Sequence, residues 1–217
     1  MLPNTIAILT SNDVKHNNAD DVMGFTQNND LFYLSGIDQE DTLLVLYPDA
    51  IKEENKVILF VSETNEHTKI WDGERLSKEQ SIHISGITRI EWRHDFEKLL
   101  QYLQLLQRWN KAFNLTAIRD PLQMVRLHLL DSLAINPYVQ GLKSIIDVGT
   151  GPGLPGIPLA ILNPDINFTL LDSNGKKTRF LFQAINELTL NNASEVNHRV
   201  EAYKPDQLFD AVVSRAF

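Results

Sequence analysis

One segment, residues 144–158, constrains the fold of this chain more than any other. It reads SIIDVGTGPGLPGIP: a short β-branched run that ends in an acid, then closely spaced glycines, then a new apolar segment. This order predicts a buried strand, a tight turn and the start of a helix. Glycines in such a turn allow positive φ and close approach of a ligand, and a helix start offers unpaired N–H groups. An α/β sheet binds nucleotide-type ligands at crossovers of this kind.

The residues after this turn alternate between helical and strand patterns. The expected elements are a helix at 154–162, a strand at 167–171, a helix at 176–188, and strands at 195–200 and 209–214. This order is typical of a doubly wound parallel α/β sheet.

Two amphipathic helices are expected before the turn. The first starts at Asp95 as its N-cap and carries Trp109 on its apolar face. The second starts at Asp120-Pro121, an N-cap followed by a proline at the first helical position. Its apolar face includes Met124 and Leu127, and we expect Pro137 to end it.

The net charge of −8 is spread unevenly along the chain. Residues 1–96 carry 8 Lys and Arg against 17 Asp and Glu, whereas residues 97–217 carry 12 against 11. This asymmetry predicts two domains with a boundary at 96/97. The first domain has strand patterns at 5–10, 43–47, 57–61 and 82–92, which indicate a mixed sheet.

Composition excludes several classes of protein. The 43% hydrophobic content permits a packed core, and the absence of cysteine excludes disulfides and thiolate metal sites. None of the six histidines forms a helical pair of metal ligands, so no metal site is expected. No apolar run has the length of about 20 residues that a membrane span needs, and the N-terminus lacks a secretory pattern, so a cytoplasmic protein is expected.

The glycines permit two interpretations of the ligand. Gly151, Gly153 and Gly156 satisfy the dinucleotide pattern G-x-G-x-x-G, with Asp172 at about the 20-residue distance that this pattern expects. Alternatively, Asp147 with the following glycines fits S-adenosylmethionine (SAM), whose sulfonium and ammonium groups suit a nearby acid.

Two prolines favour the second interpretation. Pro152 and Pro155 remove two N–H donors from a turn that would otherwise cradle phosphate. Asp172 is expected either to accept hydrogen bonds from ribose hydroxyls or to cap the next helix.

The second domain resembles the bacterial 16S rRNA guanine-N7 methyltransferase G family, also called glucose-inhibited division protein B. The matching segments are WNKAFNLTAI at 109–118, HLLDS at 128–132, residues 146–158, TLLDS at 169–173 and FDAVVSRAF at 209–217. One departure is Arg126-Leu127-His128, because this family usually has adjacent Arg and His. The family implies SAM as cofactor and 16S rRNA in the small ribosomal subunit as partner.

The resemblance implies SAM contacts at Gly149, Leu154, Val200, Glu201 and Arg215. Together with the residues singled out by the motif, the expected cofactor-binding set is Gly149, Gly151, Gly153, Leu154, Asp172, Val200, Glu201 and Arg215. Guanine N7 carries an exposed lone pair, so alignment with the methyl donor is enough and no catalytic residue is expected.

The first domain resembles the N-terminal domain of aminopeptidase P. The resemblance rests on GFTQNNDLFYLSG at 24–36, on residues 43–46 and on residues 70–73, and Thr26 replaces the arginine of that family. In that family a separate domain with a two-metal site carries the chemistry, and nothing after residue 96 resembles it. We therefore expect no peptidase activity, and a framing or oligomerisation role for residues 1–96.

The chain is thus expected to be a chimera of an aminopeptidase-P-like domain (1–96) and a Rossmann-like SAM-methyltransferase domain (97–217) truncated before its last strands. The leading hypothesis is a SAM-dependent rRNA methyltransferase whose activity the truncation puts in doubt. The alternative is a non-catalytic scaffold or oligomerisation module. Self-association is expected through the first domain or through the exposed last strand.

Overall fold

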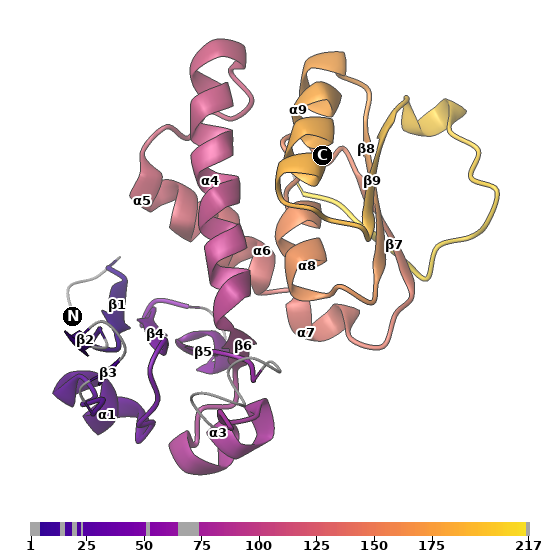
Figure 1. Ribbon diagram of the computed structural model, residues 1–217. Coiled ribbons are helices and arrows are strands. Elements are labelled where there is room, and N and C mark those ends of the chain that lie inside the picture. The colour runs from indigo at the N-terminus through magenta and orange to yellow at the C-terminus, as the bar shows by residue number, and fades with distance from the viewer. Residues whose placement is uncertain are drawn as a thin grey trace. The chain divides into compact units, whose positions relative to one another are not determined.

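The computed structural model describes residues 5–13, 16–18, 21–22, 24–50, 53–64 and 74–215. It divides into two compact units, Met1–Phe96 and Glu97–Phe217. Each unit combines a β-sheet with helices, which confirms the predicted α/β class (Figure 1). Residues 70–73, one of the segments that carry the first resemblance, and Ala216-Phe217 lie outside the described residues. In the described part, no helix is long and apolar enough to cross a membrane.

The first unit has a four-stranded mixed sheet in the order β1-β4-β5-β6. Its strands are β1 (Ala7–Thr10), β4 (Leu43–Leu46), β5 (Val57–Val61) and β6 (Ile90–Trp92). The first three strands pair antiparallel, and β6 joins β5 in parallel, so the sheet is mixed as predicted. The strands β2 (His16–Asn18) and β3 (Asp21–Val22) form a separate antiparallel pair.

Helix α1 (Asn29–Ser35) explains much of the GFTQNNDLFYLSG segment. The Asn28 side chain accepts the N–H of Asp30 at 3.0 Å and so caps the helix. Gly36, at φ 68°, ends it in the left-handed region that glycine tolerates. Leu31 is fully buried beneath. This part of the motif is therefore accounted for by helix formation.

The strand expected at 82–92 is wrong for its first half, because Lys78–Ser85 forms helix α3. Ser77 and Gln80 form a capping box that starts this helix. Ile82 and Ile84 are 39% and 48% exposed, so their alternation with polar residues does not reflect a buried strand face. A 3-10 helix, η1 (Glu53–Asn55), lies in the loop before β5.

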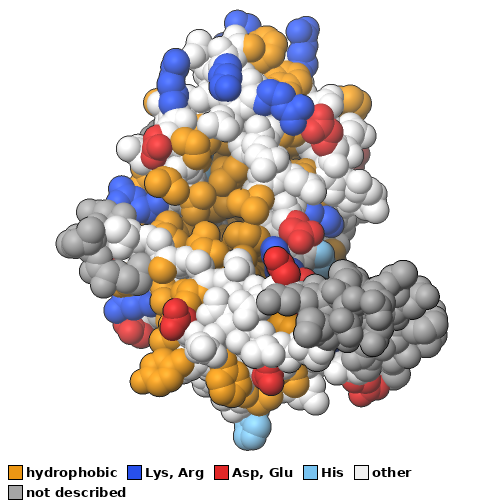
Figure 2. Space-filling model, turned by 60° about the vertical axis from the view of Figure 1, so that its left-hand side comes forward, with side chains coloured by type: hydrophobic (Ala, Val, Ile, Leu, Met, Phe, Trp, Pro, Cys, Tyr) orange, Lys and Arg blue, Asp and Glu red, His pale blue; other side chains and the backbone are white. Residues whose placement is uncertain are grey.

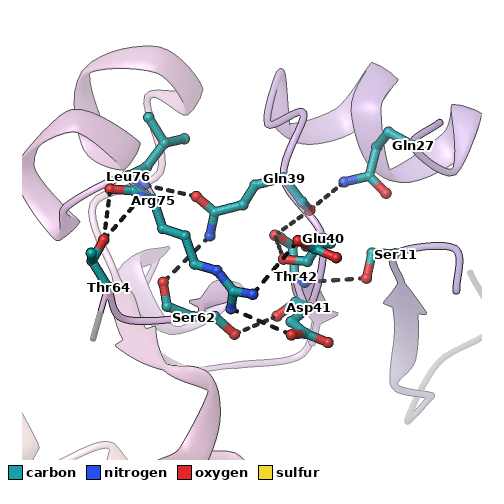
Figure 3. A network of polar contacts seen from close by, with 10 residues as sticks. All are labelled: Ser11, Gln27, Gln39, Glu40, Asp41, Thr42, Ser62, Thr64, Arg75 and Leu76. Carbon is teal, nitrogen blue, oxygen red and sulfur yellow. Dashed lines mark hydrogen bonds and ion pairs between the residues drawn. The ribbon is translucent and has the colours of Figure 1, made fainter. Parts of the chain in front are cut away.

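A polar network around Gln39 joins the loops of the first unit (Figure 3). Gln39 is 8% exposed. Its Oε1 accepts the N–H of Leu76 at 2.7 Å, and its carbonyl accepts Gln27 Nε2 at 2.8 Å. Arg75 reaches the carboxylates of Glu40 and Asp41 at 3.6 and 3.4 Å. The network ties residues 75–76 to the segment that leads into β4.

The second unit has a parallel sheet in the order β10-β7-β8-β9, which confirms the predicted parallel α/β sheet. The strand expected at 195–200 instead ends at Asn197. Its strands are β7 (Ser144–Val148), β8 (Asn167–Asp172), β9 (Ala193–Asn197) and β10 (Ala211–Val213). Helix α8 (Gly156–Leu162) follows β7, helix α9 (Gly175–Glu187) follows β8, and a 3-10 helix η3 (Val200–Ala202) follows β9.

The main core of this unit lies between the sheet and the helices that pack on it. Helix α4 (Arg93–Phe113) contributes Tyr102 and Leu106 to the same buried cluster as Phe168 of β8 and Phe180 of α9. Ile146 and Val148 belong to a smaller cluster with Leu171, because alternate residues of a strand face opposite sides of the sheet.

The helices between α4 and β7 differ from the prediction. Asp120 does cap α5 (Pro121–Met124), but the chain then forms a π-helix, η2 (Val125–Leu130), before α6 (Asp131–Leu133). The wider turn breaks the 3.6-residue period, so Leu127 is 39% exposed although the period places it on the apolar face. Pro137 lies in the first turn of α7 (Asn136–Val139), where proline is tolerated, rather than ending a helix. Helix α4 begins at Arg93, so Asp95 lies inside its first turn.

Gln39→Ala tests the role of the network in the first unit. The substitution leaves the partly buried N–H of Leu76 without its side-chain acceptor and removes the buried amide of Gln39, so we expect the free energy of unfolding to fall by about 1–3 kcal/mol. Urea denaturation measures the change. Thr26→Ala, at an exposed position of the same unit, serves as the control and should change stability by less than about 0.5 kcal/mol. Equal stability of the two variants would contradict the assigned role.

Candidate functional site

A crevice of about 430 Å³ lies at the carboxyl ends of the parallel strands in the second unit. This is the edge at which doubly wound sheets bind their ligands. Its lining comes from the ends of β7 and β8, the start of α9 and the segment after β9. The lining residues are Val148, Gly149, Leu171, Asp172, Ser173, Lys177, His198, Arg199, Val200 and Glu201.

The glycine-rich turn satisfies its own backbone donors. The N–H groups of Gly149 and Thr150 both donate to the carbonyl of Leu171, at 2.9 and 3.1 Å. Further along, the N–H groups of Gly153 and Leu154 donate to the Thr150 carbonyl, and that of Ile157 donates to the Gly153 carbonyl. Two side chains accept the remaining N–H groups: Gly151 donates to the Asp172 carboxylate, and Gly156 donates to the Asp147 carboxylate. Pro152 and Pro155 have no N–H. The expectation that this turn offers unpaired N–H groups to a ligand is therefore wrong.

Asp147 supports the start of α8 rather than lining the crevice. Its side chain is fully buried, and its Oδ2 accepts the Thr150 hydroxyl at 2.6 Å and the Gly156 N–H at 2.9 Å. Its Oδ1 has no hydrogen-bond partner among the described residues. Burial raises the pKa of Asp147 to about 6, and the two hydrogen bonds and the charge of Arg215 oppose this rise.

Gly156 is required by this arrangement. A Cβ at this position would overlap the Leu170 side chain and would lie 2.8 Å from Asp147 Oδ2. The carboxylate can therefore approach the helix start only because residue 156 has no side chain.

Asp172 lies at the end of β8, lines the crevice and is 7% exposed. Its Oδ2 accepts the N–H of Gly151 at 2.9 Å, and its Oδ1 accepts the N–H of Asn174 at 2.8 Å. Lys177 Nζ lies 3.6 Å from Oδ2. The cap of α9 is Asn174, so the alternative that Asp172 caps this helix is wrong.

The remaining expected residues of the turn have different surroundings. Gly149, at φ 68°, lines the crevice. Gly151, at φ 62°, has room for a Cβ, whose nearest neighbours would be Lys177 Nζ at 3.9 Å and the Gly149 carbonyl oxygen at 4.0 Å. Gly153, at φ 95°, packs against Ile157 so closely that a Cβ would overlap it. The Leu154 side chain is 2% exposed and belongs to the core. Gly153 and Leu154 thus shape the turn from its buried side.

Val200 and Glu201 lie in η3 and line the crevice opposite the end of β8. Ser173, Lys177, His198 and Arg199 also line it and were not singled out from the sequence. Their closeness in sequence to Asp172 and Val200 could have predicted this position, because residues that follow parallel strands share one edge of the sheet.

Arg215 follows β10 and is not among the residues that line the crevice. Its guanidinium contacts η2 and the first residue of α6, and its charge opposes the rise in the pKa of Asp147 that burial causes. On the same side of the turn, the Tyr102 hydroxyl of α4 donates to the carbonyl of Pro152 at 2.9 Å. Burial raises the pKa of Tyr102, so this donor stays protonated.

Two family models match the chain. The model described as rRNA small subunit methyltransferase G matches residues 95–217, and the model described as aminopeptidase P, N-terminal domain, matches residues 1–110. Both matches agree with the resemblances that the sequence motifs carry.

Curated relatives carry the same description as the first of these family models. Ribosomal RNA small subunit methyltransferase G of Yersinia pestis (strain Pestoides F) is 55% identical over 136 residues, which are 63% of this chain and 65% of that protein. The protein of the same description from Yersinia pseudotuberculosis (serotype O:1b) gives the same values. The chain therefore spans about 65% of the length of these relatives.

Solved structures similar to this chain include proline aminopeptidase P II from Yersinia pestis, at 24% identity and a TM-score of 0.40, covering 48% of this chain and 24% of that one. Aminopeptidase P from E. coli gives 22% identity and a TM-score of 0.41, covering 48% and 23%.

Asp147→Asn tests the buried carboxyl. The amide oxygen keeps an acceptor for Gly156 and Thr150, while the ionisable group is lost. A carboxyl whose pKa is raised from 3.8 to about 6 in the folded state holds its proton more tightly when folded, so its contribution to stability falls as pH rises through this range. We therefore expect the stability of the variant relative to the wild type to rise by about 1–3 kcal/mol between about pH 5 and about pH 7. Urea denaturation at both pH values measures this, and a pH-independent difference would contradict the assignment.

Proposed function

The chain belongs to the rRNA small subunit methyltransferase G family through residues 95–217 and to the aminopeptidase P N-terminal domain family through residues 1–110, and from this premise we propose that its second unit is a SAM-dependent methyltransferase. The proposed cofactor site is the crevice at the ends of β7, β8 and β9. The proposed substrate is a guanine N7 of 16S rRNA.

The observation that carries the proposal is that the N–H groups of the glycine turn are hydrogen-bonded within the protein. A pyrophosphate-binding turn needs free backbone N–H groups at the helix start. Here every N–H group between Gly149 and Ile157 already donates to an acceptor within the protein. This weighs against a dinucleotide. The crevice supplies carboxylate acceptors instead, at Asp172 and Glu201, together with apolar surface from Leu171 and Val200.

These groups fit SAM in kind and in size. Hydroxyl groups of a ribose donate to carboxylates, an adenine ring packs on apolar side chains, and a crevice of about 430 Å³ is within the usual range for a small-molecule site. We assign hydroxyl recognition to Asp172, whose carboxylate the Gly151 and Asn174 N–H groups already orient. We assign the adenine edge to Val200 and Glu201, and close approach of the cofactor to Gly149.

When bound, SAM supplies an electrophilic methyl group. The protein's part is to orient the cofactor and the accepting base, because guanine N7 carries its own lone pair and needs no general base. Gly151, Gly153 and Leu154 act by fixing the shape of the turn. Arg215, which follows β10, is proposed to bind an anionic group of the cofactor.

Calorimetric titration with S-adenosylhomocysteine tests the proposed cofactor. We expect binding to the full chain, and about fivefold to tenfold weaker binding to Glu201→Gln, because a hydrogen bond to a charged acceptor becomes one to a neutral amide. Glu187→Gln, at the end of α9 and outside the crevice, is the matched control and should bind like the wild type. Absence of binding, or equal binding of NAD⁺, would refute the proposal.

The proposed RNA partner is supported by the charge at the same end of the second unit. Trp109 of α4 packs against Phe180 of α9 with ring centroids 5.7 Å apart, so the end of α4 lies beside the start of α9. Exposed cations follow these two helix ends: Arg108, Lys111, Arg119, Lys176 and Arg179. Lys177 and Arg199 continue the basic surface into the crevice. Figure 2 shows Lys and Arg side chains gathered at the end of the molecule where α4 ends.

The five exposed cations form no ion pair with any described carboxylate. Phe113 is 43% exposed and lies 5.1 Å from Trp109, ring centroid to ring centroid, so it offers a base-stacking surface beside these cations. Unpaired cations with an exposed aromatic ring are typical of surfaces that bind single-stranded RNA. We call these five cations the basic end.

Neutralising two members of the basic end tests the RNA contact. For Lys111→Gln/Arg179→Gln we expect weaker binding of a 16S rRNA fragment and a salt dependence, log K against log salt, that is shallower by about 1.4, or about 0.7 for each lost phosphate contact. Filter binding at several salt concentrations measures this. Lys143→Gln, just before β7 at the opposite edge of the sheet, is the control and should leave the slope unchanged. An unchanged slope in the double variant would contradict the RNA surface while leaving cofactor binding as a separate question.

A further inference from the structure

Arg215 is held by three acceptors on the helical segment before β7. Its Nη1 lies 3.0 Å from the Leu127 carbonyl and 3.2 Å from Asp131 Oδ2. Its Nη2 lies 3.4 Å from Nδ1 of His128. All three acceptors belong to the π-helix η2 or to the first residue of α6. π-helical turns occur frequently at functional sites, and this one gathers acceptors around one cation.

His128 is engaged through both ring nitrogens. It is 4% exposed, and its Nε2 lies 3.1 Å from the Thr116 hydroxyl oxygen. A guanidinium only donates hydrogen bonds, so Nδ1 must accept from Arg215 and the ring proton must be on Nε2. The ring is therefore neutral and donates from Nε2 to Thr116.

The loop that carries Thr116 is fixed in turn by α4. Asn110, 4% exposed, accepts the N–H of Thr116 on Oδ1 at 2.9 Å and donates from Nδ2 to the Ile118 carbonyl at 3.3 Å. The Thr116 oxygen also accepts the N–H of Ile118 at 3.2 Å. A continuous series of hydrogen bonds thus runs from α4 through the loop and His128 to Arg215.

We propose that His128 is a positioning residue that holds Arg215 in place to receive the carboxylate of the bound cofactor's amino-acid portion. Arg215 keeps donors for that group: its Nε and the second N–H of Nη2 have no acceptor among the described residues, and its side chain is 29% exposed. A guanidinium with two free N–H groups suits a carboxylate. This inference rests on the proposed cofactor, and its tests separate the two.

The protonation state of His128 gives the positioning role a specific signature. Burial lowers the pKa of His128, and the charge of Arg215 lowers it further, while the Leu127 backbone and Asp131 act in the opposite direction. The charged groups that face the ring are Arg215 and Asp131, and Asp147 is the buried carboxyl coupled to the same guanidinium. Protonation of Nδ1 turns the acceptor into a donor and releases Arg215, so cofactor affinity falls on acidification.

The experiment compares His128→Asn with His128→Ala. The asparagine oxygen takes the place of Nδ1 as an acceptor that does not titrate. For S-adenosylhomocysteine at about pH 8 we expect about tenfold weaker binding to His128→Ala and binding within about threefold of the wild type to His128→Asn. Between about pH 8 and about pH 5.5, the wild type should lose affinity more steeply than His128→Asn. Gln123→Ala, at an exposed position of α5, is the control and should follow the wild type.

Two outcomes overturn the inference. One is wild-type affinity and a wild-type pH profile in His128→Ala. The other is an Nδ1–H tautomer of His128 at neutral pH in long-range ¹H–¹⁵N correlation spectra, where the Nε2–H tautomer is expected. If the wild type binds no S-adenosylhomocysteine, the proposed cofactor fails, and the tautomer alone still decides whether His128 holds Arg215.

Discussion

Two buried carboxylates at neighbouring strand ends hold the glycine turn on which the second unit depends. Asp147, at the end of β7, receives the N–H of Gly156, and Asp172, at the end of β8, receives the N–H of Gly151. Each carboxylate thus accepts a hydrogen bond from a backbone N–H that a turn of this kind would otherwise present to a ligand. The N–H groups of the turn from Gly149 to Ile157 are therefore all bonded internally, and in the proposed site ligand recognition falls to the groups beside the turn.

Polar side chains that the proposed site uses lie on both sides of the turn. On one side, Asp172 and the η3 residues Val200 and Glu201 form the crevice. On the other side, Tyr102 bonds to the carbonyl of Pro152, and His128 with its neighbours orients Arg215. With the roles proposed above, the helices before β7 take part in the site, although their amphipathic pattern alone indicates core packing. Both sides of the turn are held by side chains from elements far apart in the sequence.

The sequence predicts the sheet and the turn well because they depend on local signals. Apolar runs such as residues 57–61 and the glycine spacing after Asp147 each indicate one structure. The predictions are wrong where a tertiary contact determines the local structure or the hydrogen-bond partner. The turn's N–H groups look free in sequence because their acceptors, such as the Leu171 carbonyl, come from another strand. The π-helix at η2 and the role of His128 leave no periodic signal, and Ile82 and Ile84 mimic a strand within a capped helix.

The most direct test of the proposed site is amide mapping by NMR during titration with S-adenosylhomocysteine. We predict shifts concentrated at Gly149, Ser173, Val200 and Glu201, with the amides of Gly153 and Gly156 still protected from exchange because their hydrogen bonds are internal. Shifts confined to residues away from the ends of β7, β8 and β9, or ligand-dependent loss of protection at Gly156, would contradict a crevice that binds its ligand beside a closed turn.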